Sequence, residues 1–178
     1  LPGKVAPLDP DAERWLEEPA ATFVTLHRCG ELHGCIGSIE PRRRLVDDVR
    51  HNAAAAAFID PRATPLHPAD LDELEVEVSL LGPLEPLSFR SEEDALSQLR
   101  PGVDGVVFAY GSRRATFLPQ VWESLPEPRE FLEHLKVKAG FPPDFWAEGV
   151  TLYRYGLQKW SEDDDPRPEQ HARAGHVS

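Results

Sequence analysis

Residues 21–39 read ATFVTLHRCGELHGCIGSI, and this stretch decides the fold class of the protein. Residues 23–26 are strand formers, and Gly30 can form a turn with the residue on either side of it. We therefore expect a β-hairpin in which Val24 and Cys35 share one face. Cys29 then points to the other face, so the two cysteines should not form a disulfide bond.

The rest of the chain shows helical and strand periodicities in a mixed order. A strand is predicted at 74–81, where Val76, Val78 and Leu80 should face a core and the residues between them a wetter surface. Because helices and strands do not alternate strictly, the pattern predicts an α+β fold with antiparallel sheets. The other predicted elements are helices at 45–58, 91–99, 128–140 and 142–149, a hairpin at 103–122 and a strand at 150–160.

The charge of the chain narrows the range of partners. The protein has 178 residues, a formal net charge of -12 and a pI near 5.0. Nucleic-acid binding usually rests on clustered Lys and Arg, and the only basic run, 42–44, is typical of a solvated helix start. We therefore expect no general nucleic-acid binding. A small cationic ligand or a basic protein partner fits this charge better.

Cysteine content and hydropathy predict the location of the protein. Two cysteines are too few for a disulfide framework and fit free thiols in a cytosolic protein. No apolar stretch approaches the roughly 20 residues that span a bilayer. The first ten residues lack the basic and apolar regions of a secretory signal. We therefore expect a cytoplasmic protein without membrane contact.

Cys35 is the first candidate catalytic residue, because Gly34 and Gly37 flank it. Glycines in a strand either let a ligand approach the backbone or mark a bend. In the first case Gly34 and Gly37 bind a ligand beside a reactive thiol, and in the second Cys35 is a small buried hydrophobe. A reactive thiol needs a neighbour that favours the thiolate, and His33 and His51 are the candidates.

Several charged residues are candidates for proton transfer or binding. Glu40 and Glu77 would lie near Cys35 in a sheet that pairs 32–40 with 74–81, although glutamates on such strands commonly face solvent. Asp60 and Arg62 follow the helix predicted at 45–58. They form either a binding loop or a local ion pair where the helix stops.

No motif in the sequence indicates a cofactor. The chain has no phosphate-binding loop, no GxGxxG after a strand, and no CxxC or HExxH metal motif. It also has no GxSxG nucleophile elbow. We therefore expect neither a metal site nor a bound cofactor.

An ordered series of motifs over about residues 20–160 closely resembles the AMMECR domain family, also called AmmeMemoRadiSam system protein A. The motifs are GELHGCIGSIEP (30–41), DPR (60–62), LEVEVSLL (74–81), LRPGVDGVVFAYGSRRATFLPQVW (99–122) and FLEHLKVKAG (131–140). The family hallmark is a Leu-Arg-Gly-Cys-Ile-Gly stretch, and here His33 replaces the arginine. A histidine binds an anion only when it is protonated. Within the fourth motif, Gln120 joins the candidate binding residues.

The resemblance implies two lobes, each an antiparallel β-sheet flanked by helices, with a cleft between them. Mapped onto this chain, the larger lobe takes 1–82 plus 148–160 and the smaller inserted lobe takes 83–147. Residues 161–178 have no periodicity and are predicted to form a disordered acidic tail.

The resemblance also implies a function without naming a substrate. It suggests a component of an AmmeMemoRadiSam-type modification system, with a radical S-adenosylmethionine (SAM) protein and a Memo-like protein as partners. Two hypotheses follow. In the first, Cys35 is a nucleophile or covalent carrier in the cleft. In the second, the protein is a non-catalytic adaptor, and the glycine-flanked segment docks a partner.

Overall fold

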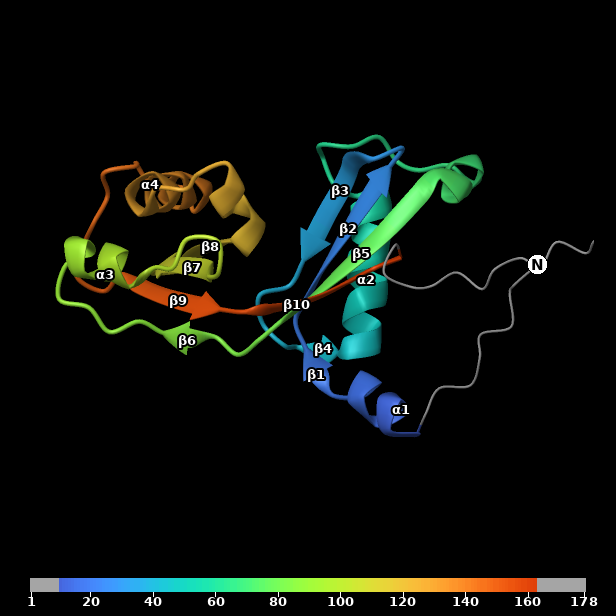
Figure 1. The fold of residues 1–178 in the computed structure, drawn as a ribbon, viewed down its shortest axis with the longest axis horizontal. Helices are drawn as coiled ribbons and strands as arrows, with labels where there is room; N and C mark the ends of the chain where they lie inside the picture. Colours follow the sequence, from blue (N-terminus) through green and yellow to red (C-terminus); the bar gives the residue numbers. More distant parts are fainter. Residues whose placement is uncertain (1–9, 163–178) are drawn as a thin grey trace, which may run out of the picture.

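Two four-stranded antiparallel sheets organise the protein in the computed structural model, which describes residues 10–162 (Figure 1). The first sheet has the strand order β10-β5-β2-β3, and the second has the order β6-β9-β7-β8. The strands of the first sheet are β2 (Thr22–Arg28), β3 (Glu31–Gly37), β5 (Leu74–Leu81) and β10 (Leu157–Ser161). Those of the second are β6 (Glu85–Pro86), β7 (Gly105–Tyr110), β8 (Arg113–Phe117) and β9 (Thr151–Tyr155).

Helices flank both sheets, so the predicted α+β class with antiparallel sheets is confirmed. The helices are α1 (Pro10–Leu16), α2 (Leu45–Phe58), α3 (Glu92–Gln98) and α4 (Pro128–Lys138). Short 3₁₀ segments lie at Pro68–Glu73 and Pro119–Glu123, and β1 (Pro19–Ala20) pairs with β4 (Arg43–Arg44). No described helix is long and apolar enough to cross a membrane.

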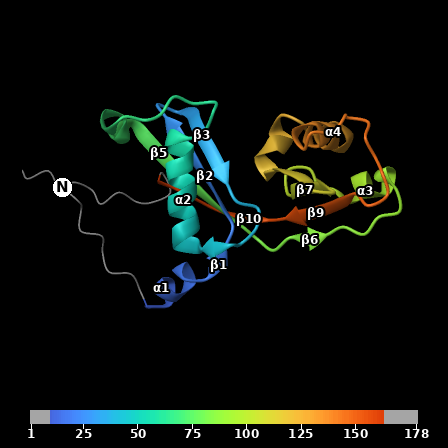
Figure 2. The ribbon, with the colours of Figure 1, turned by 180° about the vertical axis from the view of Figure 1, so that it is seen from behind.

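The long helix α2 covers one face of the first sheet (Figures 1 and 2). Its alanine-rich half buries Ala56 and Ala57 against Val24 and Leu26 of β2. Alanine is the best helix former and lets the helix approach the sheet closely. The helix predicted at 45–58 is confirmed to the residue.

The face assignment predicted for the hairpin was wrong, because β3 contains a bulge. Cys29 and Gly30 form the turn, both with positive φ, as a tight two-residue hairpin requires. The register then shifts between Leu26 and His27, and His33 is left without a partner residue. One extra residue turns every later side chain to the other face. Cys35 therefore lies opposite Thr25 and not opposite Val24.

The two sheets share a small apolar core. Phe23 and Leu81 of the first sheet pack with Val107 and Tyr155 of the second. The face of β5 that was expected to be wet is therefore partly covered, and Ser79 is only 2% exposed. The prediction failed there because α2 covers one face of the sheet and the second sheet approaches the other.

The chain crosses between the sheets at two neighbouring points. After β5 it passes through Gly82, whose backbone N–H donates to the carbonyl of Gly156 at 2.9 Å. The strand predicted at 150–160 is in fact two strands, which Gly156 separates. Since β9 pairs with β6 and β7, the chain returns to the first sheet at Gly156 and not near residue 148.

The second sheet carries its own helical cover. Ser91 caps α3 by accepting the backbone N–H of Asp94 at 3.2 Å. The ring of Trp122 stacks on Phe131 of α4, with centroids 3.7 Å apart. The prediction of a helix at 142–149 is wrong: the segment forms separate turns and ends at Gly149 with a positive φ.

Of the tail predicted at 161–178, only the first two residues are described. Ser161 is the last residue of β10. The carboxylate of Glu162 accepts the backbone N–H of Val76 at 3.0 Å. These two residues therefore belong to the fold, and the others lie outside the described residues.

Candidate functional site

Cys35 lies in a row of side chains on the face of the first sheet that is turned toward the second. Thr25 stands opposite Cys35 on one side and opposite Glu77 on the other. The Thr25 hydroxyl donates to Cys35 Sγ at 3.3 Å. Lys159 Nζ lies 3.1 Å from a carboxylate oxygen of Glu77. Thiol, hydroxyl, carboxylate and ammonium groups thus line one face.

Glu77 is farther from Cys35 than the sequence suggested, because β2 lies between β3 and β5. Strands are about 4.8 Å apart, so two steps separate the two Cα atoms by roughly 10 Å. This separation is therefore too large for a proton to pass directly between Glu77 and the thiol. A bound molecule lying along the face would reach both groups.

Asp60 and Arg62 hold the outer edge of β3 at Cys35. Asp60 Oδ2 accepts the Cys35 backbone N–H, and Arg62 Nη2 donates to the Cys35 carbonyl, both at 3.0 Å. Arg62 Nη2 also lies 2.7 Å from Asp60 Oδ2. The hydrogen bonds from Arg62 hold the pKa of the Asp60 carboxyl well below its ordinary value, against the opposing effect of burial. This pair supplies the main-chain partners that a further strand would have given.

Lys138 is the site residue that the sequence reasoning missed. It is the last residue of α4, and its Nζ donates to the Thr116 carbonyl at 2.8 Å. Burial lowers the pKa of Lys138, and the charge of Arg62 lowers it further, while Cys35 acts in the opposite direction. The electrostatic effects of Arg62 and Cys35 on Lys138 thus connect three segments that are far apart in the sequence. The only signal was the lysine in KVKAG, which nothing tied to residue 35.

Gly34 and Gly37 lack side chains because the protein fills that space itself. A Cβ on Gly34 would lie 2.3 Å from the carbonyl oxygen of Ala56 in α2. A Cβ on Gly37 would lie 2.2 Å from the ring of Phe23. Helix α2 approaches Gly34 closely, and the Phe23 ring approaches Gly37. These glycines therefore leave no open path for a ligand.

The two candidate histidines differ in their surroundings. His33 is the bulged residue of β3, and its Nε2 is the one buried side-chain polar atom without a hydrogen-bond partner among residues 10–162. His51 is exposed on α2, which covers the opposite face of the sheet from Cys35. The structure therefore does not bring His51 to the thiol.

No contact of Glu40 or Gln120 with Cys35 is found among the hydrogen bonds and ion pairs of residues 10–162. Glu40 forms ion pairs with Arg42 and with Arg114 of β8. These hydrogen bonds, that of Arg42 first, hold the pKa of Glu40 below its ordinary value, so it is a poor proton donor near neutral pH. Gln120 is exposed and lines a separate pocket with Lys159, the partner of Glu77.

The site can therefore combine a thiol with two fixed cations. Cys35 is half-buried and unbridged. Arg62 is anchored by Asp60, and Lys138 is desolvated. Cations in such a place bind carboxylate or phosphate groups. Among residues 10–162, no group of three or more His, Cys, Asp or Glu side chains could hold a metal ion.

Comparison with known proteins agrees with the fold. A crystal structure of the uncharacterized protein PH0010 from Pyrococcus horikoshii matches with a TM-score of 0.79 and 33% identity, over 91% of this chain and 83% of that one. A protein from Methanothermobacter thermautotrophicus is 43% identical over 79% of this chain and 74% of its own length. Protein MJ0810 from Methanocaldococcus jannaschii is 39% identical over 85% and 77%.

The fold and the site define an α+β protein with two antiparallel sheets and a half-buried thiol beside cationic side chains. The AMMECR1 family model matches residues 2–160. The chain belongs to the AMMECR1 family, which confirms the resemblance seen in its motifs.

Proposed function

We propose that the protein is a component of an AmmeMemoRadiSam-type modification system and that Cys35 acts in a cleft between the two sheets as nucleophile or covalent carrier. The observation that carries the proposal is that Arg62 Nη2 donates to the Cys35 carbonyl at 3.0 Å, which fixes a guanidinium from a separate segment beside Cys35. The charges of Arg62 and Cys35 also both act on the pKa of Lys138 in α4. A purely structural thiol needs no such neighbours, since apolar packing alone accommodates it.

Each neighbour has a distinct role in this proposal. Lys138 supplies a positive charge that stabilises the thiolate with which Cys35 attacks a substrate, in line with the electrostatic effect of Cys35 on the pKa of Lys138. Arg62 stays charged and binds an anionic group of the substrate, because its guanidinium keeps donors beyond those it gives to Asp60. Glu77 contacts the far end of a substrate that lies along the row.

Alkylation of the native protein tests this proposal, with Cys29 as the internal control. Cys29 is exposed and Cys35 is half-buried, so accessibility alone favours Cys29. We expect iodoacetamide to modify Cys35 several-fold faster than Cys29, as read by mass spectrometry. In Lys138→Met, the rate at Cys35 should fall at least about threefold with Cys29 unchanged. Lys159→Met, which removes a different lysine of the same face, is the matched control.

Two results would count against the catalytic role. If Cys35 reacts only after the protein unfolds, the thiol is structural. If Lys138→Met and Lys159→Met change the rate at Cys35 equally, Lys138 has no specific part.

The adaptor function remains the second candidate, and one observation favours it. Phe58 and Ile59, immediately before Asp60, are 58% and 72% exposed, and β3 beside them is an edge strand. Exposed apolar residues beside a sheet edge suit a partner protein. An adaptor would keep its binding to a radical SAM or Memo-like protein in Cys35→Ser and lose it in Ile59→Asp. A catalyst would show loss of function in Cys35→Ser with binding intact.

A further inference from the structure

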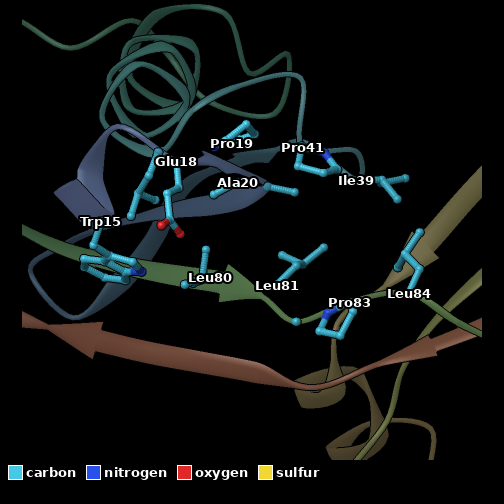
Figure 3. Close-up of a pocket in the computed structure, with 13 residues that line it drawn as sticks. Trp15, Glu18, Pro19, Ala20, Ile39, Pro41, Leu80, Leu81, Pro83 and Leu84 are labelled. Atoms are coloured by element: carbon cyan, nitrogen blue, oxygen red, sulfur yellow. The ribbon is translucent and has the colours of Figure 1, made fainter.

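A pocket of about 330 Å³ lies at the end of the first sheet, between β1, the end of β5 and the segment that crosses to the second sheet (Figure 3). Its size falls in the range of small-molecule sites. The end of β5 forms its floor with Leu80 and Leu81, and the segments around Ile39 and Leu84 close one end. Trp15 and Glu18 stand at the opposite end (Figure 3).

Glu18 is the one charged side chain among the described residues that line this pocket. Figure 3 shows its carboxylate directed toward the space between Trp15 and Leu80. Within residues 10–162, no hydrogen bond or ion pair joins this carboxylate to another side chain. Its neighbour Glu17, by contrast, forms an ion pair with Arg44. Glu18 is an exposed residue, so its carboxylate is accessible to a cationic group that enters the pocket from solvent.

Trp15 adds a second feature that favours a cation. Its ring packs edge-on against Trp160 of β10, with centroids 5.8 Å apart, which fixes its position. The residue is still 41% exposed. Trp is the aromatic side chain that binds cations best over its face. An ammonium group at this end would therefore meet a carboxylate and an indole ring together.

The opposite end of the pocket sets the orientation of a ligand. Ile39 also lines a neighbouring pocket that contains Arg42, Arg43 and Arg114. These three guanidinium groups pair with the two carboxylates of Glu40 and Asp48, which leaves one positive charge in excess at this end, so the charged end of a ligand belongs beside Glu18. The leucines and prolines between the two ends offer apolar side chains to the body of a ligand.

We propose that this pocket binds a small organic monocation, a primary ammonium group on a short apolar chain. The ammonium lies between Glu18 and Trp15, and the chain extends over Leu80 and Leu81 toward Ile39. The net charge of -12 raises the local concentration of such cations around the protein. This site is independent of Cys35 and of the function proposed for it.

Three probes with the same six-carbon chain and different head groups test the proposal. Calorimetry on the full chain at pH 7 would compare hexylammonium with hexanol, which is neutral, and hexanoate, which is anionic. We expect hexylammonium to bind at least about tenfold more tightly than either, since a charge-assisted contact is worth about that much. Glu18→Gln should lose that advantage, and Trp15→Leu should weaken hexylammonium binding while leaving hexanol unchanged.

Glu17→Gln is the matched control, because it removes a neighbouring carboxylate that lies outside the pocket lining. It should leave hexylammonium binding unchanged. The proposal is overturned if hexanol binds as tightly as hexylammonium, if Glu18→Gln has no effect, or if hexylammonium shows no binding at millimolar concentrations. Circular dichroism of each variant establishes that it is folded.

Discussion

The carboxylate of Asp60 accepts the backbone N–H of Cys35 at 3.0 Å, at the open edge of the first sheet. Asp60 is only 4% exposed, and Arg62 completes the arrangement on the Cys35 carbonyl. The DPR motif thus gives the backbone of Cys35 the two hydrogen bonds that a neighbouring strand would have supplied. It fixes the backbone of Cys35 and, through the same guanidinium, places a cation beside the thiol.

Replacing Asp60 should therefore destabilise the protein. Asp60→Asn removes the charge that pairs with Arg62 and weakens the bond to the Cys35 amide, and we expect a loss of about 2–4 kcal/mol in the free energy of unfolding. Urea denaturation measures this loss. Glu75→Gln, an exposed change on β5, should stay close to wild type. Equal stability of both variants would show that the edge does not depend on Asp60.

Acid should weaken the fold through the same carboxyl. The pKa of Asp60 is lower in the folded protein than in the unfolded chain, mainly because Arg62 donates to it. Its stabilising contribution is therefore complete above the unfolded value of about 3.9 and is lost as the pH falls below it. We expect the free energy of unfolding to fall more steeply below about pH 4 in wild type than in Asp60→Asn. Parallel pH profiles would contradict the shift.

The packing role of Gly34 predicts a large effect of one methyl group. In Gly34→Ala the new Cβ would lie 2.3 Å from the Ala56 carbonyl oxygen, so α2 must move away from the sheet. We expect a loss of about 1–3 kcal/mol, read from chemical denaturation. Gly156→Ala is the control, because nothing lies within 4 Å of its added Cβ. If Gly34→Ala is as stable as Gly156→Ala, the glycine serves another purpose.

The ion pair of Lys136 and Glu92 lies in the helices beside the second sheet. Removing the carboxylate should destabilise the protein more than removing the ammonium. Lys136 is fully buried and pairs with Glu92, while its Nζ also donates to the Pro143 carbonyl at 3.3 Å. Glu92→Gln leaves a buried ammonium without its counter-ion and should cost about 3–5 kcal/mol. Lys136→Met removes the charge, keeps the apolar stem and should cost less.

The double variant separates the two contributions. If the unpaired charge is the cause, Lys136→Met in the Glu92→Gln background should recover part of the lost stability. Thermal unfolding of all three variants measures this. A larger loss in Lys136→Met than in Glu92→Gln would show that the lysine stabilises the fold by its charge.

The sequence by itself determined the local elements of this protein. Alternation fixed β5 at Leu74–Leu81, and the alanine run with the following Pro61 fixed α2 at Leu45–Phe58. The sequence also predicted a turn at Gly30, because glycine accepts positive φ, but it left open which neighbour shares the turn. Such features depend on neighbours a few residues apart, and for this reason the α+β class was predictable.

Only the tertiary structure decided the site. The bulge at His33 determines the face of the sheet on which Cys35 lies. The crossing at Gly156 places β9 in the second sheet and β10 in the first. Lys138 reaches the neighbourhood of Cys35 across more than a hundred residues of chain. No periodicity encodes these relationships, because they arise from how two sheets and a helix pack together. The physical reason is that side-chain alternation reports exposure along one element, whereas a site depends on contacts between several.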